Sequence, residues 1–161
     1  MAAGSAYEQE FAEFMANSAS SLQHTAWLLT GDEHASEELV QEALTRTFMH
    51  WRQARRDPLR YARKLLTSRR AAAAKGILRE RVVAQVPDAA VPSSEAATLE
   101  RDRLSRALSS LSPRQRQIVV LRYFEGLSEQ EVAAELGVAV GTVKSTASRA
   151  LTELREILEP S

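Results

Sequence analysis

The chain has 161 residues and a mass of 17.8 kDa, which suits one large domain or two small ones. Its apolar content of 44% can fill a core and its charged content of 26% is ordinary, so wholesale disorder is excluded. The lack of cysteine excludes a disulfide framework, thiolate metal sites and a cysteine nucleophile. No apolar run reaches the ~18 residues of a membrane span, and the first residues lack the pattern of a secretory signal. We therefore expect a cytoplasmic protein without membrane insertion.

The formal net charge of zero hides two blocks of opposite sign. Residues 1–50 hold eight acidic side chains and one basic side chain, whereas residues 51–81 hold eleven basic and two acidic ones. The first block therefore carries −7 and the second carries +9. Such blocks indicate one face for a protein partner and another for a polyanion, with a pair of solvated helices as the alternative.

Apolar residues recur at three- and four-residue steps and no segment alternates with a period of two, so we predict an all-α fold. The stripe of a first helix is formed by Phe11, Met15, Leu22, Ala26 and Leu29, and Gly31 interrupts it. The stripe of the next helix ends with Phe48 and Trp51, which we expect in the core. The pair Asp57-Pro58 predicts a helix start, and this helix can run on through the alanines at 71–74.

The composition changes at residues 86–94, where two prolines and the loss of helical period indicate a linker. We predict two small helical domains over residues 1–85 and 99–161, joined by a linker at residues 86–98. In the second domain, Ser112 with Gln115 and Ser128 with Glu131 have the spacing of capping boxes, and each predicts a helix start. The helix after Ser112 should continue through Tyr123, and a last helix is expected over residues 141–158.

A helix-turn-helix pattern lies at about residues 129–148. Ala133 leaves room for the second helix to cross, Gly137 allows a positive φ in the turn, and Val143 packs the second helix onto the first. The exposed face of that second helix offers short hydroxyls and two cations, which suit base edges and phosphates in a major groove. We assign DNA contacts to Thr142, Lys144, Ser145, Ser148 and Arg149.

Two observations weigh against strong DNA binding by this domain alone. The same spacing fits a helical hairpin that binds no DNA. Four acids, Glu125, Glu129, Glu131 and Glu135, precede the second helix of the motif. Because DNA affinity depends on neutralising phosphates, we expect the isolated domain to bind weakly.

The second half of the chain resembles region 4 of bacterial sigma factors, the initiation subunits of RNA polymerase. The resemblance is carried by Leu121-Arg122-Tyr123-Phe124-Glu125-Gly126-Leu127-Ser128 and Gly141-Thr142-Val143-Lys144-Ser145. Regulators of the LuxR type carry a similar helix-turn-helix, so a stand-alone regulator of that type is an alternative. The first half resembles region 2 of the extracytoplasmic-function (ECF) sigma factors of the sigma-70 family, in the form typical of an actinobacterial branch. Its matching residues are Trp27-Leu28-Leu29-Thr30-Gly31-Asp32 and Glu38-Leu39-Val40-Gln41-Glu42-Ala43-Leu44.

The resemblance implies an alternative sigma factor that binds core RNA polymerase, directs it to promoters and uses no cofactor, metal or covalent chemistry. It places contact with the clamp helices of the polymerase β′ subunit on Leu39, Val40, Gln41, Glu42 and Thr45. It places recognition and melting of the −10 promoter element on Arg55, Arg56, Tyr61, Arg63, Lys64, Ser68, Arg69 and Arg70. The second domain would contact the β flap and the −35 element, and an anti-sigma factor is a further implied partner.

The sequence departs from the family at Ser68, at the alanines at 71–74 and at Thr146, where an amide, an aromatic and a basic residue are usual. A sigma-like interaction protein with weak promoter melting is therefore a further alternative. We expect no enzyme, because His24, His34 and His50 lie far apart and no catalytic motif accompanies them. We read the three histidines as surface or core residues.

Overall fold

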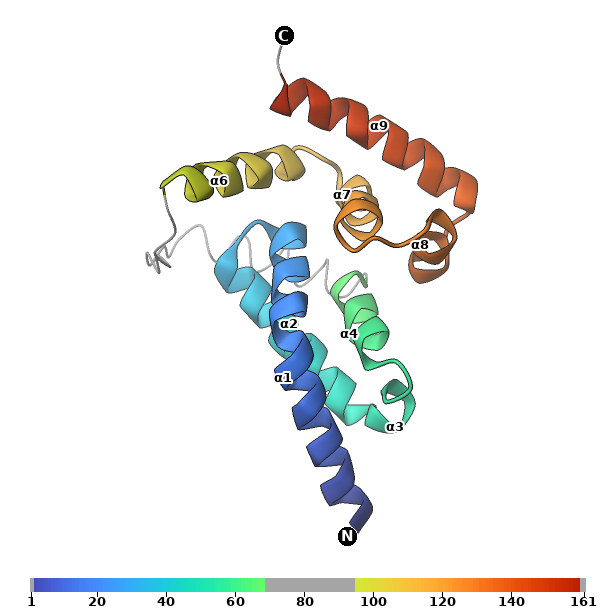
Figure 1. The fold of residues 1–161 in the computed structure, drawn as a ribbon. Helices are drawn as coiled ribbons and strands as arrows, with labels where there is room; N and C mark the ends of the chain where they lie inside the picture. The colour runs from blue at the N-terminus through green and yellow to red at the C-terminus, as the bar shows by residue number, and fades with distance from the viewer. Residues whose placement is uncertain (1, 69–94, 160–161) are drawn as a thin grey trace.

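The computed structural model describes residues 2–68 and 95–159. Within these two stretches the chain forms helices and no strand, which confirms the predicted all-α fold. The helices make up two units, one on each side of the undescribed residues 69–94 (Figure 1).

The first unit consists of α1 (Ala2–Thr30), α2 (Glu33–Met49), α3 (Trp51–Ala54) and α4 (Pro58–Leu66). α1 and α2 pack against each other, and the chain turns between them at Gly31, which has a φ of 70°. Asp32 caps α2, because its carboxylate accepts a hydrogen bond of 3.3 Å from the amide of Ala35. Asp57 caps α4 ahead of Pro58 in the same way, so the helix start predicted there is confirmed.

α4 ends at Leu66, so the prediction of one helix that runs on past this residue is wrong. Thr67 Oγ1 donates to the carbonyl of Lys64 at 3.2 Å, and Ser68 Oγ donates to the carbonyl of Leu65 at 3.0 Å. Side chains that bond to nearby carbonyls compete with the continuing helix ladder. The alanines at 71–74 lie outside the described residues.

The second unit consists of α6 (Glu95–Ser109), α7 (Pro113–Val119), the π-helix η1 (Val120–Phe124), α8 (Glu129–Leu136) and α9 (Val140–Leu158). Ser112 and Ser128 each form the predicted capping box, with Gln115 and Glu131 respectively. Gly137 ends α8 with a φ of 67°, as the helix-turn-helix pattern predicted. α6 already begins at Glu95, inside the range expected for the linker.

The π-helix replaces the last turns of what the periodicity predicted as one α-helix. The amide of Glu125 donates to the carbonyl of Val120, five residues back, at 3.0 Å. The wider turn rotates the following side chains relative to an α-helix. Tyr123, through which the sequence predicted an α-helix, lies in this π-helix and is 48% exposed.

The buried side chains form two clusters. The larger cluster joins both units, because Leu28 and Leu29 of α1 share it with Leu108 of α6 and Val119 of α7. The smaller cluster fills the helix-turn-helix and consists of Ile118, Leu121, Val132, Ala133, Val143 and Ala147. The predicted crossing of α9 over Ala133 and the packing of Val143 are thereby confirmed.

Two predicted core positions on the first unit differ from the structure. Trp51 is buried as expected, but Phe48 is 44% exposed and packs only one side against Phe11, with ring centroids 4.9 Å apart. Met15 is likewise exposed, and the neighbouring Phe14 takes the buried position on α1. A helical period of 3.6 residues fixes a face only to within about one position, which accounts for both shifts.

The second unit packs on the turn between α1 and α2. Arg116 of α7 is buried, and its Nε donates to the carbonyl of Leu28 at 2.7 Å. A Cβ atom at Gly31 would lie 2.9 Å from Ser105 Oγ of α6. The turn therefore requires glycine for its positive φ and for the close approach of the second unit.

A cationic side chain of α6 covers the edge of this contact. The Arg101 guanidinium lies 4.2 Å from the centre of the Trp27 ring and 3.6 Å from the carboxylate of Glu33. Cation–π contact and ion pairing both favour this position. The two units are thus joined by apolar, polar and charged contacts around one turn.

Candidate nucleic-acid interface

The predicted recognition helix is the first part of α9, and its five assigned side chains are all exposed. Val143 and Ala147 on the opposite face are buried in the helix-turn-helix core, which fixes the orientation of the helix. Arg149 Nε donates to the carbonyl of Ser145 at 3.3 Å, and Lys144 Nζ lies 3.8 Å from a Glu129 oxygen. These exposed contacts are weak, so the surface offers hydroxyls and cations that an incoming DNA groove can engage.

Thr146 lies on the buried side of α9 and not on this exposed face. The basic residue usual at this position would have to extend around the helix to reach a phosphate. The departure at Thr146 therefore leaves the five exposed side chains of α9 unchanged.

The side chains assigned to the −10 element do not form one exposed surface. Arg56 and Lys64 are exposed, and neither forms an ion pair within the described residues. Tyr61 is half-buried beside the core, and Ser68 donates to the end of α4. Arg69 and Arg70 lie outside the described residues.

Arg55 is held by α1. Its Nη2 and Nε lie 2.6 and 3.1 Å from the two carboxylate oxygens of Glu10, and its guanidinium lies 4.8 Å from the centre of the Tyr7 ring. Trp51 Nε1 also donates to Glu10, at 3.1 Å. The hydrogen bonds from Arg55 and then from Trp51 hold the pKa of Glu10 below its usual value.

Arg63 is held by the second unit. Its Nη2 and Nε lie 2.7 and 3.0 Å from Glu135 Oε1 of α8, and the two side chains are only 12% and 2% exposed. Burial lowers the pKa of Arg63, but the hydrogen bonds to Glu135 and the surrounding carboxylates outweigh it and raise this pKa above its ordinary value. Glu135 Oε2 is buried and has no hydrogen-bond partner within the described residues.

The residues assigned to the polymerase contact divide into two layers on α2. Gln41 and Thr45 are exposed and Glu42 is half-buried, whereas Leu39 and Val40 belong to the core. Glu42 forms an ion pair of 3.0 Å with Arg46, one turn further along. Of the five assigned residues, therefore, Gln41, Glu42 and Thr45 present polar side-chain atoms at this surface.

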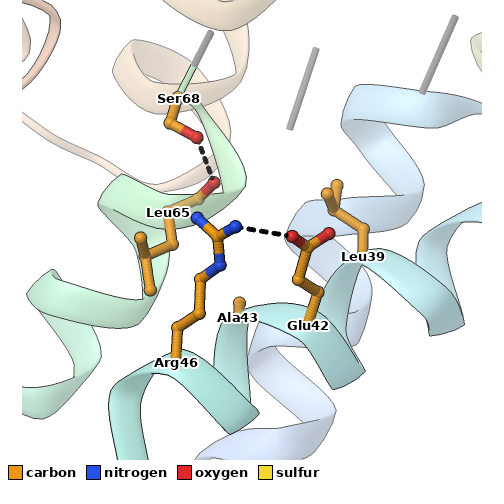
Figure 2. A pocket seen from close by; sticks show the side chains of 6 residues that line it. All are labelled: Leu39, Glu42, Ala43, Arg46, Leu65 and Ser68. Carbon is orange, nitrogen blue, oxygen red and sulfur yellow. Dashed lines mark hydrogen bonds and ion pairs between the residues drawn. The ribbon is translucent and has the colours of Figure 1, made fainter. Parts of the chain in front are cut away.

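Figure 2 shows that this surface adjoins the end of α4. A small pocket there is lined by Leu39, Glu42, Ala43, Arg46, Leu65 and Ser68. A second hollow follows α2 and includes Met49, which is 72% exposed, and His50. Arg46 and Met49 also line these hollows but were not among the residues assigned from the sequence. Their positions one and two turns after Glu42 place them on the same face of α2.

The described stretches contain neither a cluster of metal-binding side chains nor a membrane-spanning helix. No group of three histidine, aspartate or glutamate side chains there could hold a metal ion. His24, His34 and His50 are all exposed, and His34 lies 3.1 Å from Glu38. No helix in these stretches combines the length and the apolar content that a membrane crossing requires.

Comparison with known proteins identifies region 4 in the second half of the chain and sigma factors as relatives over most of its length. Residues 101–154 match the family model for sigma-70, region 4. The RNA polymerase sigma-E factor of Streptomyces avermitilis is 38% identical over 153 residues, which cover 93% of this chain and 86% of the relative. The ECF RNA polymerase sigma factor SigL of Mycobacterium tuberculosis is 32% identical over 139 residues, covering 81% and 78% of the two chains.

A solved structure has the same fold over nearly the whole length. The sigma factor RpoE of Bartonella quintana, solved in complex with the anti-sigma factor NepR, superposes with a TM-score of 0.72 at 24% identity. The match covers 95% of this chain and 99% of that one, and it supports the fold alone. The helix-turn-helix, the region 4 match and the full-length relatives together show that this chain belongs to the ECF sigma factors of RNA polymerase.

Proposed function

We propose that the chain acts as an alternative sigma factor, which binds core RNA polymerase and directs it to specific promoters. The observation that carries this function is the exposed face of α9, which displays hydroxyl and cationic side chains within a sigma region 4 fold. The relatives with which the chain aligns over most of its length are named as sigma factors. The proposed role requires no covalent step.

Recognition of the −35 element is assigned to α9. Lys144 and Arg149 carry the positive charge of this face, and Thr142, Ser145 and Ser148 supply short hydroxyls between them. Cations hold the helix against phosphates, and hydroxyls reach base edges in the major groove. The exposure of all five side chains supports their assignment to one DNA surface.

Contact with the −10 element is assigned to α4 and the segment before it. Arg56 and Lys64 are available to a DNA strand in this conformation, whereas Arg63 requires the second unit to move. Arg55 acts as an anchor between α1 and α3, because Glu10 occupies its guanidinium. Arg69 and Arg70 extend the same run of cations in the sequence.

Contact with the β′ clamp helices is assigned to Gln41, Glu42 and Thr45 on α2, and Leu39 and Val40 support that surface from the core. The acidic block that contains Glu42 suits a basic partner surface. Residues 1–85 and 99–161 were predicted as the two functional domains, and with α6 we extend the second back to Glu95. This second domain would also contact the β flap. An anti-sigma factor is a further proposed partner, since the fold relative RpoE was solved with one.

Transcription with purified components tests the function. The chain is added to core RNA polymerase on genomic DNA fragments, and the 5′ ends of the transcripts are sequenced. We expect start sites that share two upstream sequence elements and that disappear when the chain is omitted. Start sites that are identical with and without the chain would reject the function.

A further inference from the structure

The first half of α1 contacts α3 and the turn that follows it through side chains on one face of the helix. Tyr7, Glu10, Phe11 and Phe14 recur at three- and four-residue steps, so they share that face. The ring centroids of Phe11 and Phe14 lie 5.4 and 5.7 Å from that of Trp51, which is buried at the start of α3. These contacts hold α3 against α1 and leave Glu10 beside the polar edge of the Trp51 ring.

Both carboxylate oxygens of Glu10 accept hydrogen bonds from this neighbouring segment. Oε1 accepts from Arg55 Nη2 at 2.6 Å, and Oε2 accepts from Arg55 Nε and from Trp51 Nε1, both at 3.1 Å. The Arg55 guanidinium also lies 4.8 Å from the centre of the Tyr7 ring. A partly exposed ion pair with a single contact adds little, but this pair is bidentate and belongs to a network. Glu10 therefore restricts the direction of the Arg55 side chain.

Arg55 and Arg56 are the two central residues of the turn that joins α3 to α4. The amide of Asp57 donates to the carbonyl of Ala54 at 3.1 Å, which closes the turn. Asp57 then caps α4, because its carboxylate accepts from the amide of Arg60 at 3.3 Å. Since the turn has only four residues, fixing Arg55 against α1 also fixes where Arg56 and the start of α4 lie.

The two arginines of this turn differ in what they can bind. Arg56 is exposed and forms no ion pair within the described residues. Arg55 directs at Glu10 the forked N–H groups with which a guanidinium binds phosphate. Arg56 is therefore available to a DNA strand, whereas Arg55 is engaged in holding the turn.

We propose that Glu10 is a positioning residue for recognition of the −10 element, which holds Arg55 and the turn at residues 54–57 so that Arg56 faces the DNA strand. The proposal rests on the proposed function, because it takes Arg56 as a contact for the −10 strand. Glu10 itself touches no DNA in this role. Because a carboxylate repels phosphate, it aids the strand contact only through the side chains that it holds.

The first test measures binding of reconstituted holoenzyme to a fluorescein-labelled fork DNA with a duplex −35 element and a single-stranded −10 element, taken from a promoter found by transcript sequencing. Glu10→Gln keeps the side-chain size but removes the charge and one acceptor oxygen. We expect the dissociation constant to rise by about fivefold, roughly the loss of one net hydrogen bond. Glu13→Gln, at an exposed position of the same helix, is the matched control and should leave the constant unaltered.

Two results of this measurement would overturn the proposal. One is a dissociation constant that does not differ between Glu10→Gln and Glu13→Gln. The other is a lower constant for Glu10→Gln, because it would mean that Glu10 competes with the strand for the Arg55 guanidinium.

Substitution of Arg56 tests whether Glu10 acts through it. Arg56→Ala by itself should weaken fork binding at least as much as Glu10→Gln does. In a chain that carries Arg56→Ala, adding Glu10→Gln should change the dissociation constant by less than about twofold, because the contact that Glu10 positions is already lost. A further loss of about fivefold would show a general structural role of Glu10 and would contradict the proposal.

Arg55→Gln tests the same network from the other side. This variant should raise the dissociation constant about as much as Glu10→Gln, and the double variant should bind no more weakly than either single one, because both changes break one interaction. Losses that add would mean that Arg55 binds the strand itself, and they would reject its holding role.

Assembly and initiation separate this proposal from the proposed function. Co-purification with core polymerase should be equal for the unmodified chain and Glu10→Gln, since Glu10 lies on α1 and not on the α2 surface assigned to polymerase. Loss of assembly would overturn the positioning role. If the unmodified chain directs initiation while Glu10→Gln binds the fork equally well, the positioning role is rejected and the function stands. If the unmodified chain directs no initiation, the function itself is rejected.

Discussion

The two surfaces proposed to bind DNA, on α9 and on α4, differ in how exposed they are to solvent. The face of α9 is open, with five exposed side chains and, within the described residues, one ion pair of 3.8 Å from Lys144 to Glu129 of α8. The face of α4 is partly closed, because Arg63 is buried against Glu135 of the other unit. The α9 surface was assigned from its hydroxyls and cations and the α4 surface from the family resemblance. Both surfaces carry cations, so local charge alone does not tell which of them a DNA strand can reach.

The difference lies in where the carboxylates of the second unit are directed. Glu125 and Glu135 act on Arg63 of α4, whereas Glu129 lies 3.8 Å from Lys144 on the exposed face of α9. These acids reduce the net charge of the second unit. Glu135 also neutralises the charge of Arg63 on the first unit. In this structure the proposed DNA-binding side chains of α9 are exposed, whereas Arg63 of α4 is covered by the second unit.

The largest effect should come from a change that disables both surfaces together. Glu42→Lys reverses the charge on the exposed side of α2 and should abolish assembly with core polymerase, since like charges would then face each other. Glu37→Lys, an exposed residue of the same helix, is the control. Co-purification with core polymerase measures assembly, and retention of Glu42→Lys on core would contradict the α2 assignment. Leu39→Arg is unsuitable, because Leu39 is buried and a charge there would disrupt the core.

The next effect concerns the open surface alone. Lys144→Ala and Arg149→Ala should weaken initiation through the −35 element, while leaving assembly with core intact. A lost base contact costs ~1–3 kcal/mol of binding free energy and relaxes specificity at one promoter position. A lost phosphate contact weakens binding about equally on every sequence. Initiation on a set of promoters with single changes in the −35 element distinguishes the two. Arg155→Ala, further along α9, should have no effect, and equal behaviour of all three variants would refute the assignment.

Matched substitutions on the two surfaces should differ in stability. Arg63→Ala leaves the Glu135 carboxylate buried without a partner and should lower the free energy of unfolding by about 1–3 kcal/mol. Arg149→Ala removes an exposed side chain and should change it by less than about 0.5 kcal/mol. Urea unfolding of the two full-length variants measures both values. Equal losses would show that the two surfaces are equally exposed in solution.

Much of this fold follows from local sequence signals. The caps at Asp57, Ser112 and Ser128 and the left-handed turn at Gly137 each depend on residues within four positions, and all four predictions are confirmed. The pairing of Arg63 with Glu135 joins residues 72 positions apart, and that of Arg55 with Glu10 joins residues 45 apart. Helical periodicity contains no information on such distant partners. The sequence therefore identifies these cations but does not show that carboxylates far along the chain bind them.

The smallest expected effect is a pH dependence at the anchor of Arg55. Because the pKa of Glu10 is lowered in the folded chain, the ionised carboxylate stabilises the fold above its unfolded pKa, and this contribution is lost as the pH falls through the lower, folded value. The free energy of unfolding should therefore differ between the unmodified chain and Glu10→Gln at about pH 7, and the difference should shrink toward about pH 3. Glu13→Gln in the same helix is the control, and a difference that is constant with pH would contradict this role of Glu10.

We expect this sigma factor to read promoters only together with polymerase, and promoter binding with and without core polymerase tests this most directly. A labelled duplex with the sequence elements found upstream of the transcript starts is titrated with the chain alone and with the reconstituted holoenzyme at constant, physiological salt. We predict a stable, sequence-specific complex with the holoenzyme and none with the free chain, because Arg63 is occupied and the second unit carries little net charge. A tight and sequence-specific complex of the free chain would contradict the claim and favour a stand-alone DNA-binding regulator.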